Sequence, residues 1–122
     1  MPRTPVIFYR DDDGSVPVLD WLRELPAKAQ DKCRVRLERL HELGHELRRP
    51  EADYLRDGIY ELRVRLGTVN YRMLYFFHGQ TAAVVSHGLA KEASVPPREI
   101  ELARFRRLNF LAAPERHSAQ LI

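Results

Sequence analysis

The sequence has only one cysteine and no long apolar run, and these two features restrict the class of protein that it can encode. Of its 122 residues only Cys33 carries a thiol, so an internal disulfide is excluded. We expect Cys33 to be a buried apolar side chain on a helix, because free cysteines are usually buried. No apolar run approaches the roughly 20 residues that cross a bilayer, and no N-terminal segment resembles a signal peptide. We therefore expect a cytoplasmic protein with no membrane partner.

Motifs that hold phosphates, dinucleotides or metal ions are also missing. The sequence contains no P-loop, no glycine-rich dinucleotide fingerprint and no nucleophile elbow. His41 and His45 are four residues apart on a predicted helix, a spacing that can hold a metal ion, but no third ligand accompanies them. We predict neither a cofactor nor a metal site.

The composition indicates one folded domain that is mildly basic. Apolar residues make up 44% of the chain and charged residues 30%, which is typical of a globular domain. We expect one domain over residues 1–122, with a core at about 5–109 and a loosely organised tail at 110–122. The net charge is +3, but three consecutive acids at residues 11–13 offset cations elsewhere. The placement of the cations is therefore a better indicator of nucleic-acid binding than their number.

The most informative segment is GIYELRVRLGTVNYR, at residues 58–72. Apolar and charged residues alternate strictly at its start, where Glu61, Arg63 and Arg65 separate four apolar residues. A period of two predicts a strand over residues 59–66 with one buried face and one exposed face. A second strand over residues 69–77 is apolar on both faces, so we expect it to be central in the sheet. This second strand carries Arg72.

The remaining patterns predict an α+β fold with the order β-α-α-β-β-β-α. We expect a compact domain with a mostly antiparallel four-stranded sheet and helices packed on one face. The segments that we predict are a strand at 5–9, a helix from Pro17, a helix that opens at Pro26 with its apolar stripe reaching Leu47, a loop at 48–58, strands at 59–66, 69–77 and 82–89, a loop at 90–97, and a helix at 97–109.

Arg72 has two interpretations. An arginine inside a central strand is costly to desolvate without a partner, so it can form a structural ion pair with an acid such as Glu61. Alternatively it faces a concave surface and contacts phosphate, where a guanidinium can stabilise the charge of a phosphoryl transition state.

Four other cations and one histidine are candidates for the same surface. Arg63 and Arg65 lie on the predicted exposed face, where they either contact RNA or form solvated cross-strand pairs. Lys91 lies in the loop after the last strand, and Arg98 lies at the start of the last helix. His87 is a candidate proton carrier, or a half-buried strand residue whose ring is satisfied by hydrogen bonds.

The runs LRDGIYELRVRLGTVNYRMLYFF and VVSHGLAKEASVPPREIELARFR resemble the phage-derived branch of the RelE/HigB toxin superfamily, over about residues 6–107. The resemblance implies a RelE-like fold and the toxin of a type II toxin–antitoxin system. Such toxins enter the ribosomal A site and cut mRNA without a metal, by attack of a ribose 2′-hydroxyl on the adjacent phosphate. It also implies that Arg63 and Lys91 position phosphates and that Arg72 stabilises the transition state.

The sequence departs from the pattern of this branch at three points. Glu92 replaces the second lysine of a pair, and Val95 replaces a threonine. Several relatives use a C-terminal tyrosine or a histidine as proton carrier, but no tyrosine follows Tyr75 here. The general base is therefore unassigned, with His87 as the candidate.

The resemblance also implies partners. We expect a small helix-turn-helix antitoxin, the ribosome with its mRNA, and a toxin–antitoxin hetero-oligomer. Two alternatives stay open: a non-catalytic RNA- or ribosome-binding module, and a phage accessory protein that acts through a protein partner.

Overall fold

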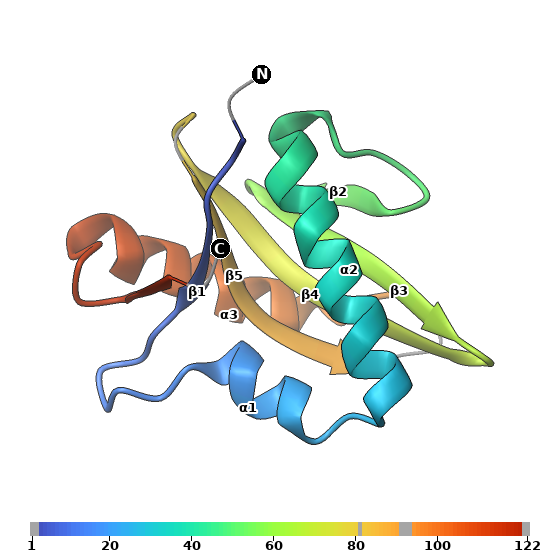
Figure 1. Ribbon diagram of the computed structural model, residues 1–122. Coiled ribbons are helices and arrows are strands. Elements are labelled where there is room, and N and C mark those ends of the chain that lie inside the picture. The colour runs from blue at the N-terminus through green and yellow to red at the C-terminus, as the bar shows by residue number, and fades with distance from the viewer. Residues whose placement is uncertain (1–2, 81, 91–93, 121–122) are drawn as a thin grey trace.

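The computed structural model describes residues 3–80, 82–90 and 94–120, which form one mixed sheet with helices on both faces (Figure 1). The six strands are arranged in the order β2-β3-β4-β5-β1-β6. Neighbours are antiparallel except β1 and β5, which are parallel. Along the chain the elements are β1 (Val6–Tyr9), α1 (Pro17–Arg23), α2 (Ala27–Leu43), the 3-10 turn η1 (Gly44–Glu46), β2 (Ala52–Arg56), β3 (Ile59–Leu66), β4 (Val69–His78), β5 (Ala82–Ala90), α3 (Pro97–Ala112) and β6 (Ser118–Gln120).

The α+β class and the antiparallel meander of β3, β4 and β5 are confirmed, but the predicted count of four strands is wrong. β2 lies in the segment predicted as a loop, and β6 lies in the predicted tail. Both are short edge strands, and their backbone hydrogen bonds come from a partner strand elsewhere in the chain. β2 pairs with β3, and β6 pairs with β1. Neither segment has the alternation of a half-buried strand, so the local sequence gave no signal.

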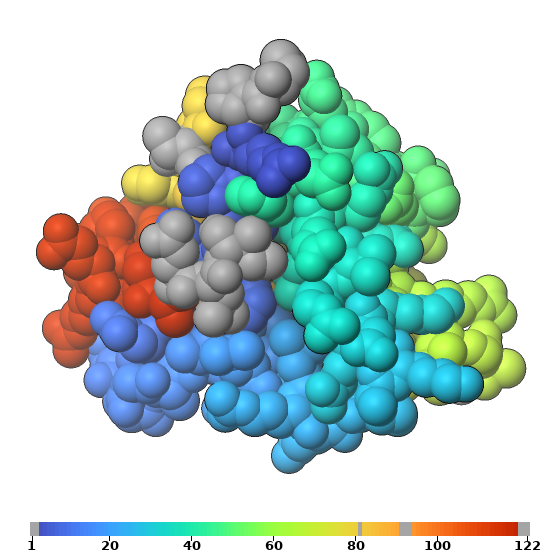
Figure 2. Space-filling model, viewed as in Figure 1, coloured from blue at the N-terminus to red at the C-terminus, as the bar shows by residue number. Residues whose placement is uncertain are grey.

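The prediction that all helices pack on one face is also wrong. α1 and α2 cover one face of the sheet, where they lie side by side in Figure 2. α3 covers the opposite face. The reason lies in β4, because Met73 and Tyr75 belong to the core under α1 and α2, whereas Leu74 and Phe76 pack with residues of α3. A strand that is apolar on both faces needs a cover on each.

The predicted apolar stripe of the second helix is confirmed in its centre. Cys33, Leu37 and Leu40 are buried against the sheet. The helix ends earlier than the stripe suggests, because Gly44 takes a φ of +52° at the C-cap. A positive φ is the usual way to end a helix on glycine. Leu47 is buried as well, but it follows η1. In the part of the chain described, no helix combines the length and apolar character that a membrane crossing requires.

Candidate functional site

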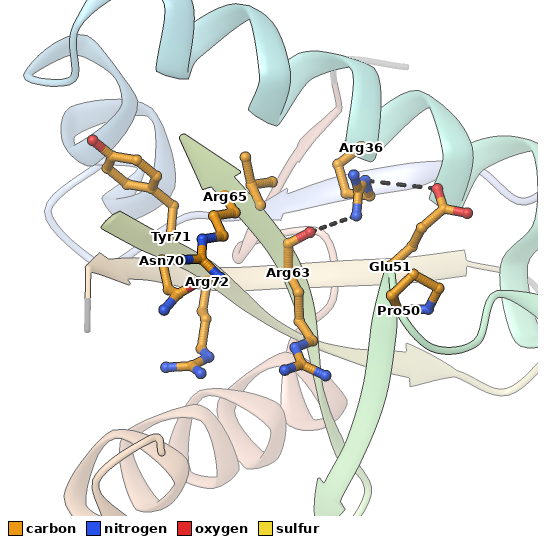
Figure 3. Close-up of a pocket in the computed structure, with 9 residues that line it drawn as sticks. Arg36, Pro50, Glu51, Arg63, Arg65, Asn70, Tyr71 and Arg72 are labelled. Atoms are coloured by element: carbon orange, nitrogen blue, oxygen red, sulfur yellow. Dashed lines mark hydrogen bonds and ion pairs between the residues drawn. The ribbon is translucent and has the colours of Figure 1, made fainter. Parts of the chain in front are cut away.

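Two arginines on neighbouring strands form the centre of the candidate site. The register of β3 and β4 places Arg63 directly opposite Arg72. Directly opposite residues project from the same face of a sheet with their Cβ atoms about 5 Å apart. Figure 3 shows both side chains pointing in the same direction. Because like charges in this arrangement repel each other, a nearby anion stabilises the pair.

These arginines line an open hollow of about 350 Å³. The sequence predicted Arg63, Arg65 and Arg72 as neighbours, and all three contribute to this hollow (Figure 3). Arg65 is exposed, and its Nε donates a hydrogen bond to the Gly67 carbonyl at the turn that follows β3. The lining as a whole comprises Arg36, Pro50, Glu51, Arg63, Val64, Arg65, Asn70, Tyr71 and Arg72.

Arg72 itself is buried and forms an ion pair with Glu61. Its Nε lies 2.8 Å from Oε1 of Glu61, and the two side chains are 9% and 8% exposed. The ion-pair interpretation is therefore confirmed. The expectation that Glu61 lies on a solvent-exposed face is wrong, because α3 covers that face of the sheet.

Burial raises the pKa of Glu61, and the charges of Arg72 and Arg63 partly oppose that rise. Among the described residues no N–H group points at Oε1 in hydrogen-bond geometry, although Arg72 lies close to it. The contact is therefore mainly electrostatic. It compensates part of the charge of Arg72 before any ligand arrives.

Arg36 of α2 is a site residue that the sequence analysis missed. Its Nη1 donates to the carbonyl of Arg63, and its Nε lies 3.6 Å from Glu51 (Figure 3). Arg36 stands three residues after Cys33 and four before Leu40, so it borders the buried stripe of the helix. That spacing was the available signal that Arg36 faces the sheet rather than solvent.

Glu51 connects the arginine hollow to α2 through hydrogen bonds. Its two carboxylate oxygens accept hydrogen bonds from Nε and Nη2 of Arg39, both at 3.0 Å. The hydrogen bond from Arg39 lowers the pKa of Glu51, so this acid stays ionised. The backbone carbonyl of Glu51 accepts from the amide of Arg63 at 2.8 Å. The segment before β2 therefore holds Arg63 in position from the side.

A comparison with protein families identifies the family of the chain. Residues 20–108 match the family model described as "Phage derived protein Gp49-like (DUF891)". The chain belongs to the phage-derived Gp49-like family. This family is RelE-like and related to toxin–antitoxin systems. A search of curated proteins found no match to the chain. The part of the chain that matches the Gp49-like model includes the arginines of the hollow.

His87 lies on β5 in this Gp49-like domain, on the face that α3 covers. Its Nε2 is 3.0 Å from Oε1 of Glu99, and its Nδ1 is 2.8 Å from Oγ of Ser86. Burial, and after it the charge of Arg106, lower the pKa of His87, which favours the neutral ring. The neutral ring can donate to Glu99 from Nε2 and accept from Ser86 at Nδ1. These contacts satisfy the ring, and its role as a proton carrier stays a prediction.

The remaining predicted residues lie away from the hollow or cannot be placed. Arg98 is exposed at the start of α3, with its Nε 3.7 Å from Glu99. It does not line the hollow, so its role in RNA binding stays a prediction. Lys91 and Glu92 fall outside the described residues. Val95, which replaces the threonine of the resembled pattern, is buried in the apolar core under α3.

Contacts within the fold surround the side chains of His41, His45 and Cys33. Nδ1 of His41 lies 2.7 Å from the carbonyl of Thr4, and His45 stacks on the ring of Phe77 beyond the end of α2. In residues 3–80, 82–90 and 94–120, no three potential metal ligands come together. Cys33 is fully buried as predicted, and burial raises the pKa of its thiol to about 11.

Proposed function

We propose that this chain is the toxin of a type II toxin–antitoxin system and that it cuts mRNA on the ribosome as a metal-independent endoribonuclease of the RelE/HigB type. The observation that carries the proposal is the placement of Arg63 directly opposite Arg72, in a hollow that Arg36 and Arg65 also line. Arg63 and Arg72 place two guanidinium groups on one face of a rigid sheet, an arrangement that suits a phosphate backbone.

The proposed reaction needs charge stabilisation at one phosphate. The ribose 2′-oxygen forms a bond to the adjacent phosphorus, and the bond from phosphorus to the 5′-oxygen of the next nucleotide breaks. The products are a 2′,3′-cyclic phosphate and a 5′-hydroxyl, so no water or cofactor is consumed. Arg63 orients the phosphate, and Arg72 stabilises the additional negative charge that develops on its oxygens. Arg65, at the rim, binds a neighbouring phosphate.

Two protons also move in this reaction. The 2′-hydroxyl loses one to a base, and the leaving 5′-oxygen gains one. His87 is our candidate base because its neutral ring can accept a proton, although it does not line the hollow of Arg63 and Arg72. To act as a base, Nδ1 has to exchange the hydrogen bond that it accepts from Ser86 for one from the 2′-hydroxyl. Groups of the ribosome can supply the second proton transfer.

The partner that we propose is a small helix-turn-helix antitoxin. It would neutralise the toxin by covering the arginine hollow with acidic side chains or by blocking entry to the ribosome. The resulting complex would be a toxin–antitoxin hetero-oligomer.

Growth arrest in a bacterium tests the proposal. We expect induction of the wild-type chain to stop growth and to produce new 5′ ends in cellular mRNA, detected by primer extension. Arg63→Ala should lower cleavage about 100-fold, because a misplaced phosphate can cost this much in rate. Arg63 is preferable to Arg72 for this test because it is only half-buried and is not the partner of Glu61.

Arg23→Ala is the matched control, because Arg23 is an exposed arginine that pairs with Asp20 on α1. It should arrest growth like the wild type. Equal activity of the Arg63 and Arg23 variants would contradict the proposed site.

One observation favours a second candidate function, a non-catalytic RNA- or ribosome-binding module. The ion pair with Glu61 already compensates part of the charge of Arg72, and this reduces what Arg72 can offer to a transition state. Growth arrest without any new mRNA ends would support this module rather than the nuclease.

A further inference from the structure

A second hollow, of about 540 Å³, lies next to the arginine hollow. The segment 49–53 separates the two. Pro50 and Glu51 line the first hollow, whereas Arg49 and Ala52 line the second. Both hollows therefore border the hydrogen-bonded turn at residues 48–51 that leads into β2.

A row of three aromatic rings leads from the core to this second hollow. Tyr75, Tyr60 and Tyr54 are successive cross-strand neighbours on β4, β3 and β2. The ring centroids of Tyr75 and Tyr60 are 5.4 Å apart, and those of Tyr60 and Tyr54 are 4.9 Å apart. Tyr75 is fully buried, but Tyr54 is 53% exposed on the edge strand β2 (Figure 1). The row therefore ends on an aromatic ring that is open to solvent.

The ring of Tyr54 is held in place although it is exposed. Its hydroxyl accepts a hydrogen bond from the backbone amide of Gly58 at 3.0 Å, and its ring makes a T-shaped contact with the ring of Tyr60. A ring fixed in this way loses little conformational entropy when a ligand stacks on it. Nucleic-acid bases are the natural ligands of such platforms, because each base has a π-face.

Cations at the rim of this hollow suit the phosphates that accompany a base. Arg49 is 74% exposed and is anchored by Asp53, whose Oδ2 lies 2.8 Å from its Nη2. Arg48 donates hydrogen bonds to the carbonyls of His45 and Leu47, which places a second guanidinium at the hollow. Proteins that bind single-stranded nucleic acid combine basic side chains and stacking rings in this way.

We propose that the second hollow is a subsite for one nucleotide of single-stranded RNA, with its base stacked on Tyr54 and its phosphate bound by Arg49. This subsite extends the proposed RNA site at Arg63 and Arg72, and it takes its ligand class from that proposed function. Stacking discriminates little between bases, so the subsite adds affinity without a strong sequence preference.

Fluorescence of a short RNA tests the subsite without the ribosome and without cleavage. The probe is an eight-nucleotide RNA with one 2-aminopurine, whose fluorescence falls when the base stacks. Tyr54→Phe keeps the ring and loses only the hydroxyl contact to Gly58, so we expect it to quench the probe nearly as well as the wild-type chain. Tyr54→Leu should bind about 5- to 150-fold more weakly, the loss that corresponds to one stacked base. Arg49→Ala should weaken binding and also reduce its salt dependence.

Three results would overturn the subsite. The first is equal binding by the wild type and Tyr54→Leu. The second is an equal loss in Tyr54→Phe and Tyr54→Leu, which would mean that the hydroxyl contact to Gly58 matters and the ring does not. The third is equally tight binding of an RNA that lacks the base at the probe position. Circular dichroism melting of each variant checks that the fold is intact.

The readout separates this inference from the proposed function. If the chain binds RNA through Tyr54 but cuts no mRNA, the subsite stands and the nuclease fails. If mRNA is cut equally by the wild type and Tyr54→Leu, and the two bind the probe equally, the nuclease stands and the subsite fails.

Discussion

Glu61 and Arg72 form a buried ion pair across β3 and β4, with Nε of Arg72 2.8 Å from Oε1 of Glu61. The two residues are diagonal neighbours, because Glu61 lies opposite Leu74 while Arg72 lies opposite Arg63. Long side chains can meet across this diagonal. The carboxylate therefore offsets the repulsion between the two arginines, and it fixes the guanidinium that the proposed reaction uses.

Removal of either partner of this pair should destabilise the protein strongly. Glu61→Leu and Arg72→Met each leave a buried charge without its partner, and such a loss typically costs about 3–5 kcal/mol. The double variant should cost clearly less than the sum of the two single variants, as measured by urea unfolding. Additive effects would contradict the coupling. The exposed pair Asp31–Arg34 is the control, and its removal should change stability little.

The stability of the protein should fall below about pH 6.5 because of His87. Burial lowers the pKa of His87 in the folded protein from its ordinary value of 6.5. Below pH 6.5, His87 is therefore protonated in the unfolded chain while it is still neutral in the folded protein. This single group contributes a slope of at most about 1.4 kcal/mol per pH unit. The stabilising contribution is complete above pH 6.5 and is lost as the pH falls toward the lowered pKa.

Unfolding free energies measured between pH 7.5 and 5 check this expectation. His87→Gln should flatten the pH dependence in that range, since glutamine does not titrate. An unchanged slope would assign the acid sensitivity to other groups.

Gly88 should tolerate no side chain. It lies on β5 directly under the indole of Trp21, and a Cβ atom at this position would overlap that ring. Gly88→Ala should therefore displace α1 and destabilise the protein by about 1–3 kcal/mol, the usual cost of overpacking. Thermal unfolding measures the loss, and near-UV circular dichroism reports the altered surroundings of Trp21. A second change, Trp21→Leu, should restore part of the lost stability, and failure to do so would argue against the steric cause.

The thiol of Cys33 should be inert in the folded protein. Burial raises its pKa to about 11, so almost no thiolate exists at pH 8, and the sulfur has no access to solvent. We expect iodoacetamide to label the protein at pH 8 only after denaturant is added. Rapid labelling of the native protein at the rate of a free thiol would show that α2 separates from the sheet.

The sequence alone determined the parts of this protein that depend on local periodicity. Strict alternation in β3 and the apolar run of β4 predicted two adjacent strands, and the spacing of Cys33, Leu37 and Leu40 predicted the buried stripe of α2. The same alternation identified Arg63 and Arg65 as residues of one face. Periodicity is sufficient for these features because it specifies which side chains share a face.

Only the tertiary structure decided which faces of the sheet are covered and which helices cover them. α3 closes over the face of Glu61, and the burial of that carboxyl is what makes its ion pair with Arg72 possible. β2 and β6 exist because distant strands supply their hydrogen bonds. Arg36 reaches the hollow because α2 packs against β3, which brings its guanidinium to the carbonyl of Arg63. These features depend on contacts between segments far apart in the chain, and a local pattern carries no information about its distant partner.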